Sequence, residues 1–73
     1  MTNQATKLFS LGKNISKFRK AKGLTQNELA DILNISRDHI AKIETAKRTP
    51  SLDLIFAITN ALNITEKELF EFN

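Results

Sequence analysis

Hydrophobic residues recur with helical spacing along most of the chain, and short polar breaks divide them into five segments. The first series has the 3-4-3 spacing of one helix face and consists of Leu8, Leu11, Ile15 and Phe18. It predicts a helix over residues 11–22, ended by Gly23. Further helices are expected over residues 26–33, 37–45, 52–62 and 66–70. Because no segment alternates as a strand does, we predict an all-α fold with five helices.

The polar start of the chain lacks this periodicity. Residues 1–10 are therefore predicted to form a flexible N-terminal arm, and residues 11–73 a single domain. A chain of 73 residues lies near the lower limit for burying its own core. Dimerisation would add stability to so small a domain.

The second and third predicted helices are separated by only the three residues 34–36. Thr25 is the expected N-cap of the first, with Glu28 completing a capping box. Ser36 is the expected N-cap of the other, where His39 stands at the third position and leaves the box incomplete. Two capped helices with so short a connection must cross at a steep angle. This is helix-turn-helix geometry, and it predicts a DNA-binding unit.

Charge is distributed unevenly along the chain, although the net charge is only +3. Residues 1–48 carry ten Lys and Arg against four Asp and Glu, whereas residues 49–73 carry one Lys against four acids. This polarity suggests one end that faces a polyanion and another that faces away from it, although an ordinary solvated surface would also account for it.

Several classes of protein are excluded by composition. There is no cysteine and a single histidine, so we expect no disulfide, no metal site and no cofactor. No cluster of nucleophile and base, paired acids or glycine-rich phosphate loop suggests an enzyme. No apolar run approaches the roughly 18 residues of a membrane span. The N-terminus lacks the apolar core of a signal peptide, so a cytoplasmic protein is expected.

Several sequence landmarks follow one another in a familiar order. They are G-L-T-Q at 23–26, E-L-A at 28–30, I-S at 35–36, I-x-x-I-E at 40–44, K-R-x-P at 47–50 and A-L-x-I at 61–64. Over about residues 11–70 the chain resembles the phage repressor and Cro type of helix-turn-helix, the XRE family. The resemblance implies a five-helix domain that dimerises on a partly palindromic operator, with the third helix in the major groove. It further implies that Arg19 pairs with Glu44.

Four positions depart from the pattern of this family. Ala46 stands where the family usually has the Gly that ends the third helix. If this site needs a positive φ, alanine costs about 1 kcal/mol, and the end of the helix would be shaped differently. Asn34 replaces a common Gly in a left-handed position that Asn tolerates. Ile32 and Phe56 stand where the family is often polar, so they add apolar surface.

The side of the third helix that faces away from Ile40 and Ile43 should carry the base contacts. The candidates are Arg37, Asp38, His39 and Lys42. Arg37 suits guanine O6 and N7, and Lys42 suits another base or a phosphate. Asp38 could accept from cytosine N4 or could stabilise the helix N-terminus through the dipole. His39 could bond to DNA or could be a plain surface histidine.

Contacts to the DNA backbone are expected around the two helix N-termini and after the third helix. The candidates are Thr25, Gln26, Ser36, Thr45, Lys47 and Arg48. Gln26 combines its amide with the N–H groups of the first helical turn, which suit a phosphate. Its alternative role is that of an ordinary first helical residue.

Apolar residues near the C-terminus exceed what a small monomer needs. We assign Phe56, Leu69, Phe70 and Phe72 to a homodimer interface through the last two helices. The alternative is a protein-interaction module, such as an antitoxin-type partner, whose main surface binds another protein. We prefer a homodimeric regulator of transcription, a repressor, that binds double-stranded DNA, although a separate protein partner is possible.

Overall fold

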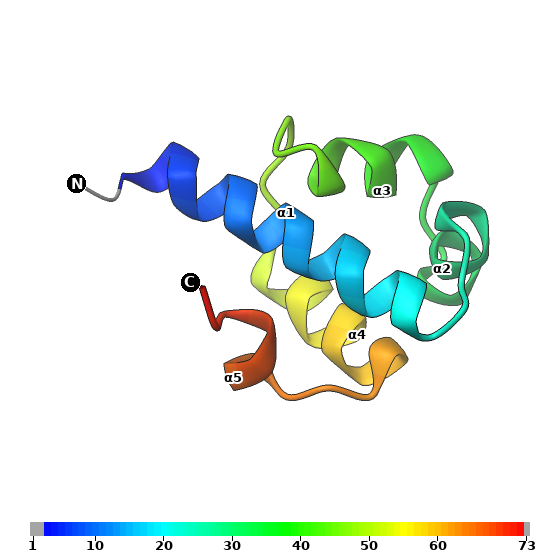
Figure 1. Cartoon of the computed structure of the whole chain (residues 1–73). Helices are drawn as coiled ribbons and strands as arrows, with labels where there is room; N and C mark the ends of the chain where they lie inside the picture. Colours follow the sequence, from blue (N-terminus) through cyan, green and yellow to red (C-terminus); the bar gives the residue numbers. More distant parts are fainter. Residues whose placement is uncertain (1–2, 73) are drawn as a thin grey trace.

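The computed structural model describes residues 3–72, which form five α-helices joined by short loops (Figure 1). Their bounds are α1 Gln4–Ala21, α2 Gln26–Leu33, α3 Arg37–Glu44, α4 Leu52–Leu62 and α5 Glu66–Leu69. No strand occurs within residues 3–72, so the predicted all-α fold with five helices is confirmed. In the same range, no helix is long and apolar enough to cross a membrane.

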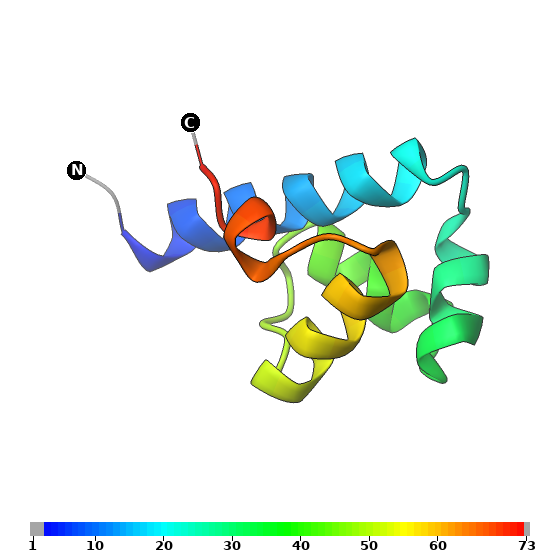
Figure 2. The ribbon, with the colours of Figure 1, turned by 90° about the horizontal axis from the view of Figure 1, so that it is seen from below.

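α1 is the central support of the arrangement. It packs against α3, α4 and α5, whereas α2 packs against α3 and α4. In the view of Figure 1, α3 lies above α1 and α4 and α5 lie below it, whereas Figure 2 shows α3 and α4 on the same side of α1. The first turns of α1 project from the body at the end where the C-terminal segment also lies, as both views show (Figure 2).

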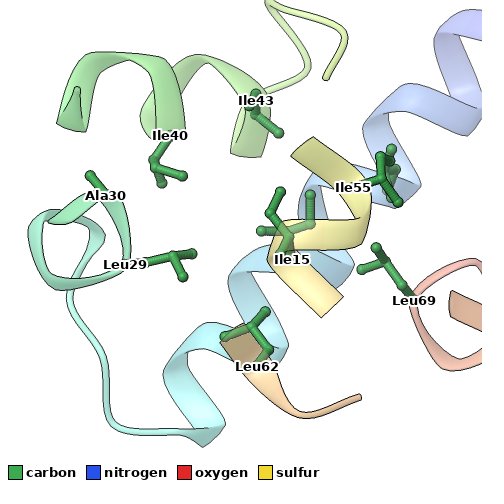
Figure 3. Close-up of a cluster of buried hydrophobic side chains, with 10 residues drawn as sticks. Ile15, Leu29, Ala30, Ile40, Ile43, Ile55, Leu62 and Leu69 are labelled. Carbon is green, nitrogen blue, oxygen red and sulfur yellow. The ribbon is translucent and has the colours of Figure 1, made fainter. Parts of the chain in front are cut away.

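Every helix contributes apolar side chains to one core. The buried residues are Leu11, Ile15, Leu29, Ala30, Ile40, Ile43, Ile55, Ile58, Leu62 and Leu69. Figure 3 shows side chains from all five helices pointing into this common interior, with Ile15 of α1 among them. Helices of eight residues are marginal in isolation, so α2 and α3 depend on this shared burial for their stability.

α1 begins at Gln4, so the predicted start near residue 11 is wrong, and residues 4–10 are helical rather than part of an arm. Asn3 caps the helix by accepting the Thr6 N–H at 2.9 Å. Leu8 lies half-buried and lines an apolar groove with Phe70 and Phe72. A local cap therefore starts the helix at Gln4, and its first turns line a groove with the far end of the chain. Residues 1 and 2 of the predicted arm lie outside the described residues.

α2 and α3 start at their predicted caps, and α5 starts at a cap of the same kind. Thr25 and Thr65 each form a complete capping box, with Glu28 and Glu68 respectively. Ser36 accepts the His39 N–H at 3.1 Å, and the box there is incomplete as predicted. α2 is terminated by Asn34 in the left-handed conformation, with φ 57°.

α4 and α5 are joined by a polar contact as well as by the core. The buried Thr59 hydroxyl lies 2.7 Å from Glu66 Oε2 and donates to it. This hydrogen bond and the backbone N–H of Glu66 stabilise the carboxylate, so the pKa of Glu66 is lowered from 4.5.

Candidate nucleic-acid interface

α3 presents one apolar face and one polar face. Ile40 and Ile43 are buried, whereas Arg37, Asp38 and Lys42 are exposed. The remaining candidate, His39, is partly buried near the start of the helix. The structure thus gathers the predicted base contacts within the first six residues of one helix, on or beside its solvent-facing side.

Two of these candidates are bound to each other in the free protein. The Lys42 Nζ lies 3.0 Å from Asp38 Oδ2, one helical turn away. Both side chains are exposed to solvent, so the pair adds only about 0.3–0.5 kcal/mol to stability. Asp38 also lies in the first turn of α3, where a carboxylate complements the helix dipole.

The ion pair implied by the family resemblance is present in the interior. Arg19 Nε lies 2.6 Å from Glu44 Oε2, and Arg19 Nη2 donates to Glu44 Oε1 at 3.1 Å. The Arg19 guanidinium also donates to the carbonyl of Leu24 at 2.7 Å. A forked pair with this geometry fixes the end of α3 and the start of α2 relative to α1.

Gln26 extends this network to the N-terminus of α2. Its Nε2 donates to Glu44 Oε1 at 3.1 Å, and the side chain is partly buried. Gln26 is also the first residue of α2, where backbone N–H groups have no intrahelical acceptor. A predicted phosphate-binding position is therefore held by the same carboxylate that holds Arg19.

The two capping hydroxyls lie at the helix starts where they were predicted to meet the DNA backbone. Thr25 Oγ1 and Ser36 Oγ accept backbone N–H groups at 3.0 and 3.1 Å. Both residues are exposed. Because each hydroxyl acts as acceptor in its cap, its own proton remains available for a phosphate oxygen.

α3 ends in a left-handed turn formed by a residue other than glycine. Ala46 has φ 62°, and the Lys47 N–H donates to the Lys42 carbonyl at 2.8 Å. The expectation that alanine would change the shape of this helix end is therefore wrong. The chain keeps the positive φ, at a cost of about 1 kcal/mol relative to glycine.

The basic loop after α3 follows this turn. Lys47 and Arg48 are exposed there, next to Thr45 at the C-cap. The Thr45 hydroxyl donates to the Ala41 carbonyl at 2.8 Å, so in the free protein its proton serves the helix end. Of the three predicted contacts to the DNA backbone here, the side chains of Lys47 and Arg48 are thus more available to bind phosphate than the Thr45 hydroxyl.

Gly12 is a positioning residue that the sequence pattern did not identify. A Cβ at this position would lie 2.6 Å from the carbonyl oxygens of Ile43 and Glu44. α1 and the end of α3 therefore approach more closely than any side chain allows. The available signal was a glycine inside a strongly periodic helix, which commonly marks close packing.

Asn14 is a second residue that the pattern did not identify. Its Nδ2 donates to the carbonyls of Leu69 and Glu71 at 2.8 and 3.2 Å. These bonds attach the end of α5 to α1. The signal was weak, because an asparagine one position before Ile15 is unremarkable in sequence.

The end of the molecule near α4 and α5 carries exposed apolar side chains. Phe56 and Phe70 are 50% and 44% exposed, and the Phe70 ring meets the partly buried Phe72 edge-to-face at 6.1 Å. Leu69, in contrast, is completely buried in the core of the same chain. Its predicted place in a dimer interface is therefore wrong, because the side chain already fills the protomer interior.

Comparison with known proteins places this geometry in a family. The profile of the helix-turn-helix family HTH_3 matches residues 15–69. The chain is 40% identical over 55 residues to the immunity repressor protein of Bacillus phage phi105. That alignment covers 75% of this chain but 38% of the phage protein, so the chain spans well under half of this relative.

Two solved controller proteins share the fold. C.AhdI from Aeromonas hydrophila, a restriction-modification controller, is 34% identical with a TM-score of 0.81, covering 85% of this chain and 94% of its own. The restriction-modification controller C.Esp1396I was solved as a tetramer in complex with its natural 35 base-pair operator. It is 26% identical with a TM-score of 0.75, covering 96% of this chain and 100% of its own.

The profile match covers more than half of the chain and includes both capped helices, α2 and α3. The resemblance to repressor-type regulators is thereby confirmed. The chain belongs to the helix-turn-helix family of DNA-binding transcriptional regulators.

Proposed function

We propose that this protein represses transcription by binding a palindromic operator as a homodimer, with α3 in the major groove. The observation that carries the proposal is the exposed polar face of α3, held in place from behind by the buried Arg19–Glu44 pair. Helix-turn-helix proteins read base edges with such a face. We also propose that the protein is cytoplasmic, in keeping with a regulator of transcription that must reach DNA.

Within this proposal Arg37 makes the main base contact. It is the first residue of α3, it is exposed, and its planar fork matches O6 and N7 of guanine. Lys42 and Asp38 follow on the same face, and His39 lies beside them. Lys47 and Arg48, together with the N-terminus of α2 at Gln26, bind phosphates on either side of the groove.

The homodimer is proposed to form through apolar side chains of α4 and of the C-terminal segment. Phe56 of α4, Phe70 after α5 and Phe72 provide aromatic surface there, and their segment of the chain carries net negative charge. Aromatic side chains are enriched at the centres of protein interfaces, whereas an acidic surface is poorly suited to DNA. A two-fold axis through this end would present two copies of α3 to successive major grooves.

Fluorescence anisotropy tests the DNA proposal. Preferred duplexes are selected from a random pool, and the protein is then titrated against a selected and a random duplex at 50 and 200 mM salt. We expect binding to both at low salt, preference for the selected duplex, and weaker binding at higher salt, because the release of counterions is then less favourable. Absence of binding to any duplex at low salt contradicts the proposal.

A protein-interaction module is the second candidate function. The exposed apolar side chains of Ile32, Leu52 and Phe56 are the observation behind it, because burial of exposed apolar area against a partner is favourable. Sedimentation with and without the selected duplex separates the two candidates. A monomer at high concentration, combined with no duplex binding, would favour the interaction module.

A further inference from the structure

The polar face of α3 carries an acidic group, although DNA is a polyanion. Asp38 Oδ2 is paired with Lys42 Nζ at 3.0 Å. The neighbouring carboxylates are engaged elsewhere. Glu44 is bonded to Arg19 in the interior, and Glu28 accepts a backbone N–H in the α2 capping box. Asp38 is therefore the exposed carboxylate of α3, on the face predicted to meet a DNA groove.

A carboxylate in the major groove discriminates strongly between bases. Guanine O6 and N7, thymine O4 and the phosphates are all acceptors that repel it, whereas the amino groups at cytosine N4 and adenine N6 can donate hydrogen bonds to it. While the carboxylate holds Lys42, the ammonium group cannot neutralise a phosphate. A pair of this kind lowers affinity for unmatched DNA in two ways, which is how specificity by exclusion operates.

We propose that the Asp38–Lys42 pair is a specificity-determining element of α3. On unmatched DNA the pair stays closed and withholds one cation from the phosphates. On a matched site an amino group of cytosine or adenine binds Asp38, and Lys42 is released to a base or a phosphate. Opening is easy, because the two side chains are 73% and 49% exposed. This inference rests on the proposed function, since it needs α3 in the groove.

Asp38→Asn and Asp38→Ala test the inference on random duplex. Both variants should bind random DNA roughly three- to tenfold more tightly at 50 mM salt, because one more cation can reach a phosphate. One added phosphate contact steepens the salt slope by about 0.9, so the advantage should shrink about 3.5-fold at 200 mM. The preference for the selected duplex over random DNA should fall by at least the low-salt gain.

Asp53→Asn is a matched control. Asp53 is the second residue of α4 after its Ser51 cap, as Asp38 is the second residue of α3 after Ser36. The control removes the same charge and the same dipole interaction from another helix. It should leave random-duplex affinity and salt slope unchanged. An equal gain from Asp53→Asn would show a net-charge effect and would overturn the inference.

The effect of Asp38→Asn is also measured in a Lys42→Met variant, which tests whether Asp38 acts through Lys42. If Asp38 acts by holding Lys42, the gain from Asp38→Asn must be smaller when Lys42 is absent, because only the direct repulsion by the carboxylate is then relieved. A gain of equal size in both backgrounds, or no gain in the original background, overturns the inference. Failure of the unsubstituted protein to bind any duplex is a separate result that refutes the proposed function instead.

Discussion

The α2–α3 half of the molecule and the end near α4 and α5 use opposite kinds of side chain. Around α3, polar groups are matched closely, because Glu44 receives bonds from both Arg19 and Gln26. At the other end, large apolar groups such as Phe56 and Phe70 remain exposed. A surface that meets a hydrated polyanion needs positioned polar groups, whereas a surface that meets protein needs apolar area. This contrast is what a division between a DNA face and a self-association face requires.

The largest expected effect tests the polar network. Glu44→Ala should destabilise the protein by about 3–5 kcal/mol, because it leaves the Arg19 guanidinium buried without its partner. Chemical denaturation measures this loss. Asp38→Ala breaks the exposed pair instead and should cost under about 0.5 kcal/mol. Similar losses from the two variants would remove the distinction between a buried positioning pair and a surface pair.

The close approach of α1 and α3 gives the next effect. Gly12→Ala should destabilise by about 1–3 kcal/mol, since its Cβ would overlap backbone carbonyl oxygens that cannot move independently. Helix propensity alone predicts the opposite sign, a gain of about 1 kcal/mol. Thermal denaturation decides between the two. A stabilised variant would mean that α3 is not held against α1 at Gly12.

Arg37→Ala tests the DNA face without touching the core. It should lose about 1–3 kcal/mol of binding on the selected duplex and much less on random DNA. Anisotropy titrations measure both values, and Lys47→Ala is the control, because a phosphate contact should weaken both duplexes alike. An equal loss on both from Arg37→Ala would make Arg37 a phosphate contact too.

Phe56→Ala and Phe70→Ala test the apolar end. Each should raise the dimer dissociation constant by about tenfold, as truncation of a central aromatic anchor commonly does. Sedimentation velocity over a concentration series measures this change. Ile32→Ala removes a similarly exposed apolar group from α2 and should leave self-association unchanged. If the phenylalanine variants behave like this control, the interface lies elsewhere.

The smallest effect concerns the end of α3. Ala46→Gly should stabilise the protein by about 1 kcal/mol, because glycine adopts the positive φ at this position without steric cost. Thermal denaturation is again the measurement. Asn34→Gly is a control with a smaller expected change, since Asn tolerates the left-handed conformation. A destabilised Ala46→Gly variant would contradict the left-handed turn.

Local patterns predicted most of the helical framework correctly. The bounds of α2 and α4 are as expected, since each helix begins after a capping hydroxyl and ends at an asparagine, and both signals are local. The start of α1 was missed, because the Asn3 cap was not recognised and because Leu8 lines a groove with Phe70 and Phe72 from the far end of the chain. The same limitation explains Leu69. Its apolar character was evident, but whether it faced the core or a partner depended on how α5 docks.

The sequence by itself determined the number and type of the helices, the caps of α2 and α3, and the polar face of α3, because these follow from interactions within a few residues. Only the tertiary structure decided how that face is held. Gly12 admits the end of α3 against α1, Glu44 joins Arg19 to Gln26, and Asn14 secures α5. These contacts connect residues far apart in sequence, so no periodicity records them. The pairing of Asp38 with Lys42 depends on both levels. The spacing of four residues along a helix allows it, and the structure shows that the two side chains meet.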